Sequence, residues 1–137
     1  MYTARRIRNA ALRIRRYLER DDNTCPDLTG CCGRASAMVA HALVQDGFKP
    51  VIAHAPGHAF VICDGYLVDV TATQFGWENE YPKVVVRKMP STDKRPWFWK
   101  NYRPHNNVYG WLKSQKRSGW YQDQMASKDD LKFAESR

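Results

Sequence analysis

The chain has 137 residues, a formal net charge of +8 and four cysteines. This length suits one domain with a real core, so residues 1–137 are expected to form a single domain. No apolar run approaches a membrane span of about 18 residues, and the basic N-terminus lacks the apolar segment of a secretory signal, although some organelle transit peptides are similarly rich in arginine. The positive charge favours acidic partners such as nucleic acid, an anionic membrane or an acidic protein face.

The cysteines are a poor disulfide framework, because two are adjacent and two are scattered. They are Cys25, Cys31, Cys32 and Cys63. We therefore expect free thiols in a reducing compartment, which predicts a cytoplasmic protein. A zinc site made from Cys25, Cys31, Cys32 and a histidine lacks the usual ligand spacing. No metal or organic cofactor is expected.

The first predicted element is a basic helix over residues 3–20. Apolar residues recur at spacings of three and four and make one stripe, at Ile7, Ala10, Ala11, Ile14 and Leu18. Arginines cover the rest of the surface, at positions 5, 6, 8, 13, 15, 16 and 20. Two interpretations stay open. The arginines are a solvated face, or they bind acidic groups, including nucleic acid.

Turn-forming residues predict a loop over 21–30, and a second helix follows over 31–46. This helix is apolar nearly all round, which predicts a central position. Its polar residues Arg34, His41 and Gln45 make a narrow outer stripe. At 100° per residue, Cys32 lies about 180° from His41. Cys32 is therefore expected on the inner face, at the helix N-terminus.

Residues 58–71 predict a β-hairpin around an Asp64-Gly65 turn, because both turn positions favour φ > 0. In this register His58 and Asp69 share one face as diagonal neighbours, within reach of a hydrogen bond. Both faces are otherwise mostly apolar, so the hairpin is expected between two layers. One explanation of the pair is a buried histidine satisfied by a carboxylate. The other is a catalytic pair.

Further strands are predicted over 50–54 and 83–87, with a loop over 73–77. Two helices followed by strands indicate an α+β architecture with an antiparallel sheet. Residues 88–137 form an aromatic and basic C-terminal portion. Its rings are expected to pack on the core as a loop-rich flap, and binding of single-stranded nucleic acid is the alternative. Residues 127–137 are a short terminal helix or disordered.

Residues 28–87 are the expected catalytic core. A thiol at a helix N-terminus is stabilised as a thiolate by the helix dipole, and a nearby imidazole stabilises it further. A carboxylate on the far ring nitrogen fixes the orientation of the imidazole. Cys32, His58 and Asp69 suit the roles of nucleophile, base and orienting group. Amides around Cys32 and Gly33 suit an oxyanion hole.

Three segments together resemble the transglutaminase-like and papain-fold deamidase group. They are Cys32-Gly33-Arg34-Ala35-Ser36, Gly57-His58-Ala59-Phe60-Val61, and Leu67-Val68-Asp69-Val70-Thr71-Ala72-Thr73-Gln74-Phe75. The resemblance covers about residues 28–76. It implies a central helix that carries the nucleophile and packs on an antiparallel sheet. Cys31 is the alternative nucleophile, although the spacing to Ala35-Ser36 favours Cys32. Phe60 stands where many members carry tryptophan.

The resemblance implies a cysteine-nucleophile enzyme that acts on carboxamide or acyl groups. A protein-glutamine deamidase or transglutaminase-like amidase is the first expectation, and a cysteine peptidase of the same fold is an alternative. Gln74 has two interpretations, a surface role and assistance at the oxyanion site. The expected substrate is a protein, with an acidic surface to match the basic chain. A non-catalytic basic module that binds nucleic acid or an acidic protein is the remaining alternative.

Overall fold

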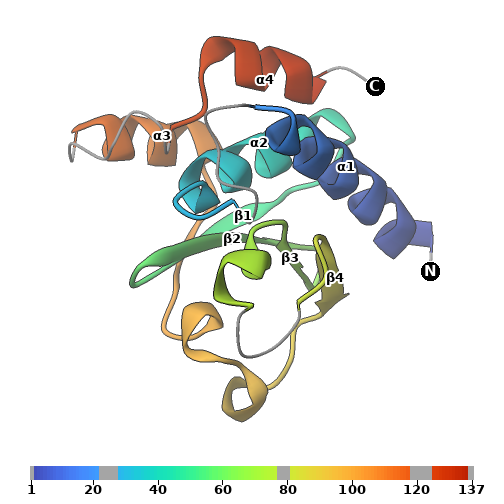
Figure 1. The fold of residues 1–137 in the computed structure, drawn as a ribbon, viewed down its shortest axis with the longest axis vertical. Helices are drawn as coiled ribbons and strands as arrows, with labels where there is room; N and C mark the ends of the chain where they lie inside the picture. The colour runs from blue at the N-terminus through green and yellow to red at the C-terminus, as the bar shows by residue number, and fades with distance from the viewer. Residues whose placement is uncertain (1, 22–27, 77–80, 118–124, 136–137) are drawn as a thin grey trace.

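The computed structural model describes residues 2–21, 28–76, 81–117 and 125–135, and within them the chain is α+β. The helices are α1 (Tyr2–Glu19), α2 (Cys32–Gln45), α3 (Val108–Arg117) and α4 (Lys128–Glu135). The strands are β1 (Val51–Ala55), β2 (His58–Cys63), β3 (Tyr66–Asp69), β4 (Val85–Lys88) and β5 (Arg103–His105). They form one sheet in the order β4-β3-β2-β1-β5, and each neighbouring pair is antiparallel. Figure 1 shows this arrangement.

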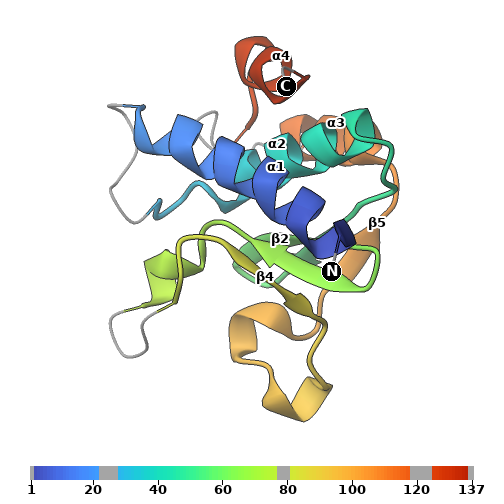
Figure 2. The same cartoon turned by 90° about the vertical axis from the view of Figure 1, so that its right-hand side faces the viewer.

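The sheet lies between a helical layer and an irregular segment rich in aromatic residues. Helices α1 and α2 cover one face, and the segment between β4 and β5 lies on the other, as Figures 1 and 2 show. That segment contains the short 3-10 helices η2 (Thr92–Lys94) and η3 (Trp97–Trp99). Val61 and Val68 belong to the core on the helical side, whereas Phe60 and Leu67 pack with Trp99 on the other side. The prediction of a hairpin buried between two layers is confirmed.

The hairpin has the predicted register. Val61 pairs with Val68, and Cys63 pairs with Tyr66. Both turn residues have positive φ, 53° at Asp64 and 81° at Gly65. The hairpin predicted over residues 58–71 is too long at its C-terminal end, because β3 ends at Asp69. The backbone N–H of Thr71 there donates to the Asp69 carboxylate instead of extending the ladder, which is the local turn that aspartate favours.

The prediction of an outer polar stripe on α2 is wrong for two of its residues, Arg34 and His41. His41 is buried, and its ring lies 2.7 Å from the Tyr109 hydroxyl of α3 and 3.1 Å from a carboxylate oxygen of Glu135 in α4. Arg34 donates two hydrogen bonds to the carboxylate of Asp130 in α4, which makes a bidentate ion pair. Helices α3 and α4 therefore cover a face that looks exposed in the isolated sequence of α2.

The C-terminal portion is more ordered than predicted where the structure describes it. For residues 127–137 the sequence left open a short terminal helix or disorder. The helix is confirmed for residues 128–135, which form α4. The strand β5 was not predicted, since Pro104 argues against a ladder position, but an edge strand tolerates it. Phe98 and Trp99 are buried on the sheet as the flap interpretation requires, whereas Trp97 is 60% exposed. Trp120 and Tyr121 lie outside the described residues.

Arg15 departs from the interpretation of the first-helix arginines as a solvated face. Its side chain is 2% exposed and pairs with Glu19. Its guanidinium donates to the Val70 carbonyl and the Thr73 hydroxyl, both at 2.8 Å. Arg15 therefore joins α1 to the chain that leaves β3, directly after Asp69.

Replacing Arg15 with glutamine should lower the free energy of unfolding by about 2–3 kcal/mol, because buried acceptors then lose a charged donor. Arg16→Gln is the matched control, since Arg16 is the adjacent residue and is exposed, and it should change stability by less than about 0.5 kcal/mol. Urea unfolding of both variants measures the difference. Equal stability of the two variants would contradict a structural role for Arg15.

Candidate active site

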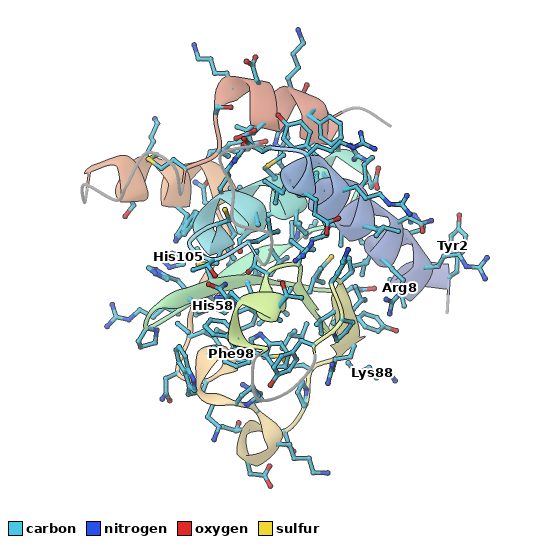
Figure 3. All side chains as sticks on the ribbon, viewed as in Figure 1. Tyr2, Arg8, His58, Lys88, Phe98 and His105 are labelled. Carbon is cyan, nitrogen blue, oxygen red and sulfur yellow. The ribbon has the colours of Figure 1, made fainter. Side chains whose placement is uncertain are left out.

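His58 begins β2, and its side chain is completely buried. Its Nε2 lies 2.7 Å from Oδ2 of Asp69, the last residue of β3. The predicted hydrogen bond between these two side chains is therefore present. The ring lies on the aromatic side of the sheet, with the Phe98 ring centroid 5.8 Å away, and Figure 3 shows both residues there.

The Asp69 carboxylate is fully occupied by hydrogen-bond donors. Oδ2 accepts from Trp99 Nε1 at 2.8 Å in addition to His58. Oδ1 accepts from the backbone N–H and the hydroxyl of Thr71, at 2.8 and 3.1 Å. Burial alone would raise the pKa of this carboxyl, but His58, Trp99 and Thr71 together hold it below its ordinary value. Asp69 is therefore ionised and rigidly oriented.

Cys32 is the first residue of α2, and its thiol lies beside the imidazole of His58. The second ring nitrogen of His58, Nδ1, is buried and makes no hydrogen bond of conventional geometry within the described residues. With Nε2 occupied by Asp69, Nδ1 is the nitrogen left for the thiol. Contacts between catalytic groups are often long or poorly aligned before a substrate binds.

The charge of His58 is set by its two partners. Burial lowers the pKa of the imidazole, but Asp69 and Cys32 outweigh this effect and raise the pKa to about 9. The imidazolium form is therefore the stable one at neutral pH, with Nε2–H donating to Asp69. A positively charged ring beside a thiol is the environment that makes a cysteine nucleophilic.

The N-terminus of α2 adds donors at the same place. The first N–H groups of a helix have no acceptor within the helix, and they carry a partial positive charge. No acidic residue stands in the first turn of α2 to compete for them. Gly33 follows Cys32 and is buried, and its missing side chain leaves room for a carbonyl oxygen close to the backbone.

Gln74 lies in the short 3-10 helix η1 (Ala72–Phe75), directly after the Asp69–Thr71 turn. Its side-chain Nε2 is buried and has no hydrogen-bond partner in the part of the chain that the structure describes. A purely surface role does not account for a buried amide donor, because an unmade buried hydrogen bond is costly. Assistance by Gln74 at the oxyanion site stays a prediction.

Aromatic rings surround the histidine. The ring centroid of Phe75 lies 4.9 Å from that of His58 in an edge contact, and the ring of Trp97 packs on Phe75 at 5.2 Å. Cys32 is 6% exposed. The rings exclude water from the His58–Asp69 pair, which strengthens its electrostatic interaction.

Sequence analysis did not identify Trp99, Phe75 or Phe98 as neighbours of the pair. The density of aromatic residues between positions 97 and 102 was the available signal, but it does not say which ring reaches Asp69. The predicted Cys32, His58 and Asp69 come together, and the first turn of α2 places Gly33 beside them.

The comparisons with known proteins give no assignment. No family model, curated protein or solved structure matches the chain. No helix in the described ranges combines the length and apolar character that a membrane span needs. Among the described residues, no group of three or more His, Cys, Asp and Glu side chains is placed to hold a metal ion, and Cys25 lies outside them.

Proposed function

We propose that this protein is a cysteine-nucleophile enzyme with a papain- or transglutaminase-like fold, and that it acts on carboxamide groups. The observation that carries the proposal is the chain of contacts from Asp69 through the buried His58 to Cys32 at a helix N-terminus. A structural histidine needs one partner for stability. It does not need a thiol beside its ring at a helix N-terminus.

The reaction follows from the roles of these side chains. The Cys32 thiolate attacks the carbonyl carbon, and the oxygen takes up the negative charge beside the first amides of α2. The imidazolium of His58 gives its Nδ1 proton to the departing ammonia as the C–N bond breaks, which leaves a thioester. Water, deprotonated by His58, then releases the acid and the free thiol. This sequence deamidates a glutamine side chain.

The same intermediate leads to the alternatives. An amine in place of water gives a cross-link, and a backbone amide as substrate makes the enzyme a peptidase. The positive charge of the chain, +8, favours protein substrates with an acidic surface. A non-catalytic basic module predicts salt-dependent binding that survives loss of Cys32.

Alkylation tests whether Cys32 is the activated thiol. Cys31 and Cys32 are both 6% exposed and Cys63 is 1% exposed, so exposure alone predicts equal labelling of the adjacent pair. We expect iodoacetamide at about pH 6.5 to label Cys32 at least about tenfold faster than Cys31, as measured by peptide mass spectrometry. His58→Ala should abolish the preference. Similar labelling of both thiols would contradict an activated Cys32.

Intact-mass analysis identifies the reaction. Glutamine-rich acidic proteins are incubated with the wild type, with Cys32→Ser and with Cys31→Ser as the matched control. Deamidation adds about one dalton per glutamine, whereas cross-linking and cleavage change the mass differently. The wild type and Cys31→Ser should produce the same change and Cys32→Ser none. Activity that survives in Cys32→Ser would refute the proposed nucleophile.

A further inference from the structure

The surface beside the C-terminal half of α1 is hollowed, and Phe133 of α4 forms part of its lining. Figure 1 shows α4 next to this part of α1. The hollow has a volume of about 380 Å³, which falls in the range of small-molecule sites. Its lining consists of Asn9, Leu12, Arg13, Arg16, Tyr17, Arg20 and Phe133. Three of these residues are arginines and none is acidic.

The three guanidinium groups differ in what they already bind. Arg13 donates to the carbonyl oxygens of Phe133 and Ala134, at 3.0 and 3.1 Å, and so caps the last turn of α4. Arg16 and Arg20 are exposed, and within the described residues neither side chain makes a hydrogen bond or an ion pair. Like charges at this i,i+4 spacing repel each other, so an anion between them would relieve the repulsion.

The floor of the hollow is aromatic. Tyr17 and Phe133 stack with ring centroids 4.1 Å apart. The Tyr17 hydroxyl is engaged with Asp130 at 3.0 Å, which leaves the ring to contact a ligand. The hollow therefore offers a flat aromatic floor with the side chains of Arg16, Arg20 and Asn9 around it.

We propose that this hollow binds a phosphate group, held by Arg16 and Arg20. Guanidinium forks match phosphate oxygens in paired hydrogen bonds. At 1.5 Å per residue, the two arginines are roughly 6 Å apart along the helix, close enough for their long side chains to meet at one anion. A phosphomonoester, or two successive phosphodiesters of a strand, neutralises both cations, whereas a single carboxylate neutralises one. The phosphate comes from a phosphorylated small molecule or from a nucleic-acid strand, and this site does not depend on the proposed catalysis.

Calorimetric titration with inorganic pyrophosphate and with a single-stranded oligonucleotide tests the proposal. The variant R16Q/R20Q should weaken binding of at least one probe by about tenfold or more. The control R5Q/R103Q removes the same charge from exposed arginines outside the hollow and should change binding less than about twofold. R16K/R20K, which keeps the charge but loses the forks, should lie between them.

The outcomes separate clearly. Pyrophosphate binding alone identifies a small phosphorylated ligand, whereas oligonucleotide binding lost only in R16Q/R20Q identifies a nucleic-acid strand. The proposal is overturned if neither probe binds the wild type, or if both double variants weaken binding equally. Unchanged thermal unfolding and unchanged Cys32 alkylation in R16Q/R20Q establish that the fold and the other site are intact.

Discussion

Asp69→Asn should lower the rate of the proposed acyl transfer on the order of 10³-fold, because the imidazole of His58 loses its orienting charge. Burial lowers the pKa of His58, and Asp69 is the main group that outweighs burial and raises the pKa to about 9, so the substitution should lower this pKa below its ordinary value. NMR titration of the His58 ring measures this shift directly and needs no substrate. An imidazole that is neutral at neutral pH no longer stabilises a thiolate on Cys32.

The hydrogen bonds around Asp69 explain why asparagine cannot substitute for it. One oxygen accepts from His58 and Trp99, and the other accepts twice from Thr71. An asparagine amide must place its NH₂ group toward one of these two sets of donors. Either orientation sets donor against donor, so the variant should also lose about 1–3 kcal/mol of unfolding free energy.

Asp64→Asn is the matched control for this substitution. Asp64 is exposed in the hairpin turn with φ of 53°, a conformation that asparagine adopts readily. It should leave the reaction rate and the stability within experimental error. If Asp69→Asn retained both the wild-type rate and the high pKa of His58, the carboxylate would have no orienting role and the catalytic proposal would fail.

The hairpin was predictable because its information is local. The Asp64-Gly65 turn fixes the register, and the two-residue period of a strand then decides which side chains share a face. The His58–Asp69 hydrogen bond follows from these two facts. The position of Cys32 at a helix start was also readable, since the apolar pattern of α2 sets where the helix begins.

The surroundings of the pair were not predictable, because they depend on distant segments. Trp99 reaches Asp69 across 30 positions of sequence, and its approach is fixed by η3 and the edge strand β5, which carry no clear periodic signal. The burial of His41 could not be predicted for the same reason, because it is buried by α3 and α4. Burial of one face by another segment is a property of the whole fold, which the composition of a single helix does not contain.

Trp99→Phe tests the donor that sequence analysis missed. The side chain is 2% exposed and its Nε1 donates to Asp69 at 2.8 Å. Phenylalanine keeps most of the buried ring but removes this donor and some volume. The free energy of unfolding should fall by about 2–3 kcal/mol, because a buried charge loses a hydrogen bond and a small void is left.

Trp97→Phe is the matched control, because it makes the same substitution within the same short helix. Trp97 is 60% exposed, so its replacement should change stability by less than about 0.5 kcal/mol. Chemical denaturation measures the free energy of unfolding of both variants. The difference between them reports the effect of the buried site and its hydrogen bond, because both variants lose an indole.

A titration of the Asp69 carboxyl carbon by NMR distinguishes positioning from packing. The Trp99 hydrogen bond is one of the interactions that hold the pKa of Asp69 below its ordinary value against the opposing effect of burial, so Trp99→Phe should move that pKa upward. A weakened core without an electrostatic role would lower stability and leave the titration unchanged. An unchanged Asp69 pKa in Trp99→Phe would therefore reduce Trp99 to a packing residue, whereas a raised pKa with a slower reaction would make it a positioning residue that acts on Cys32 through Asp69 and His58.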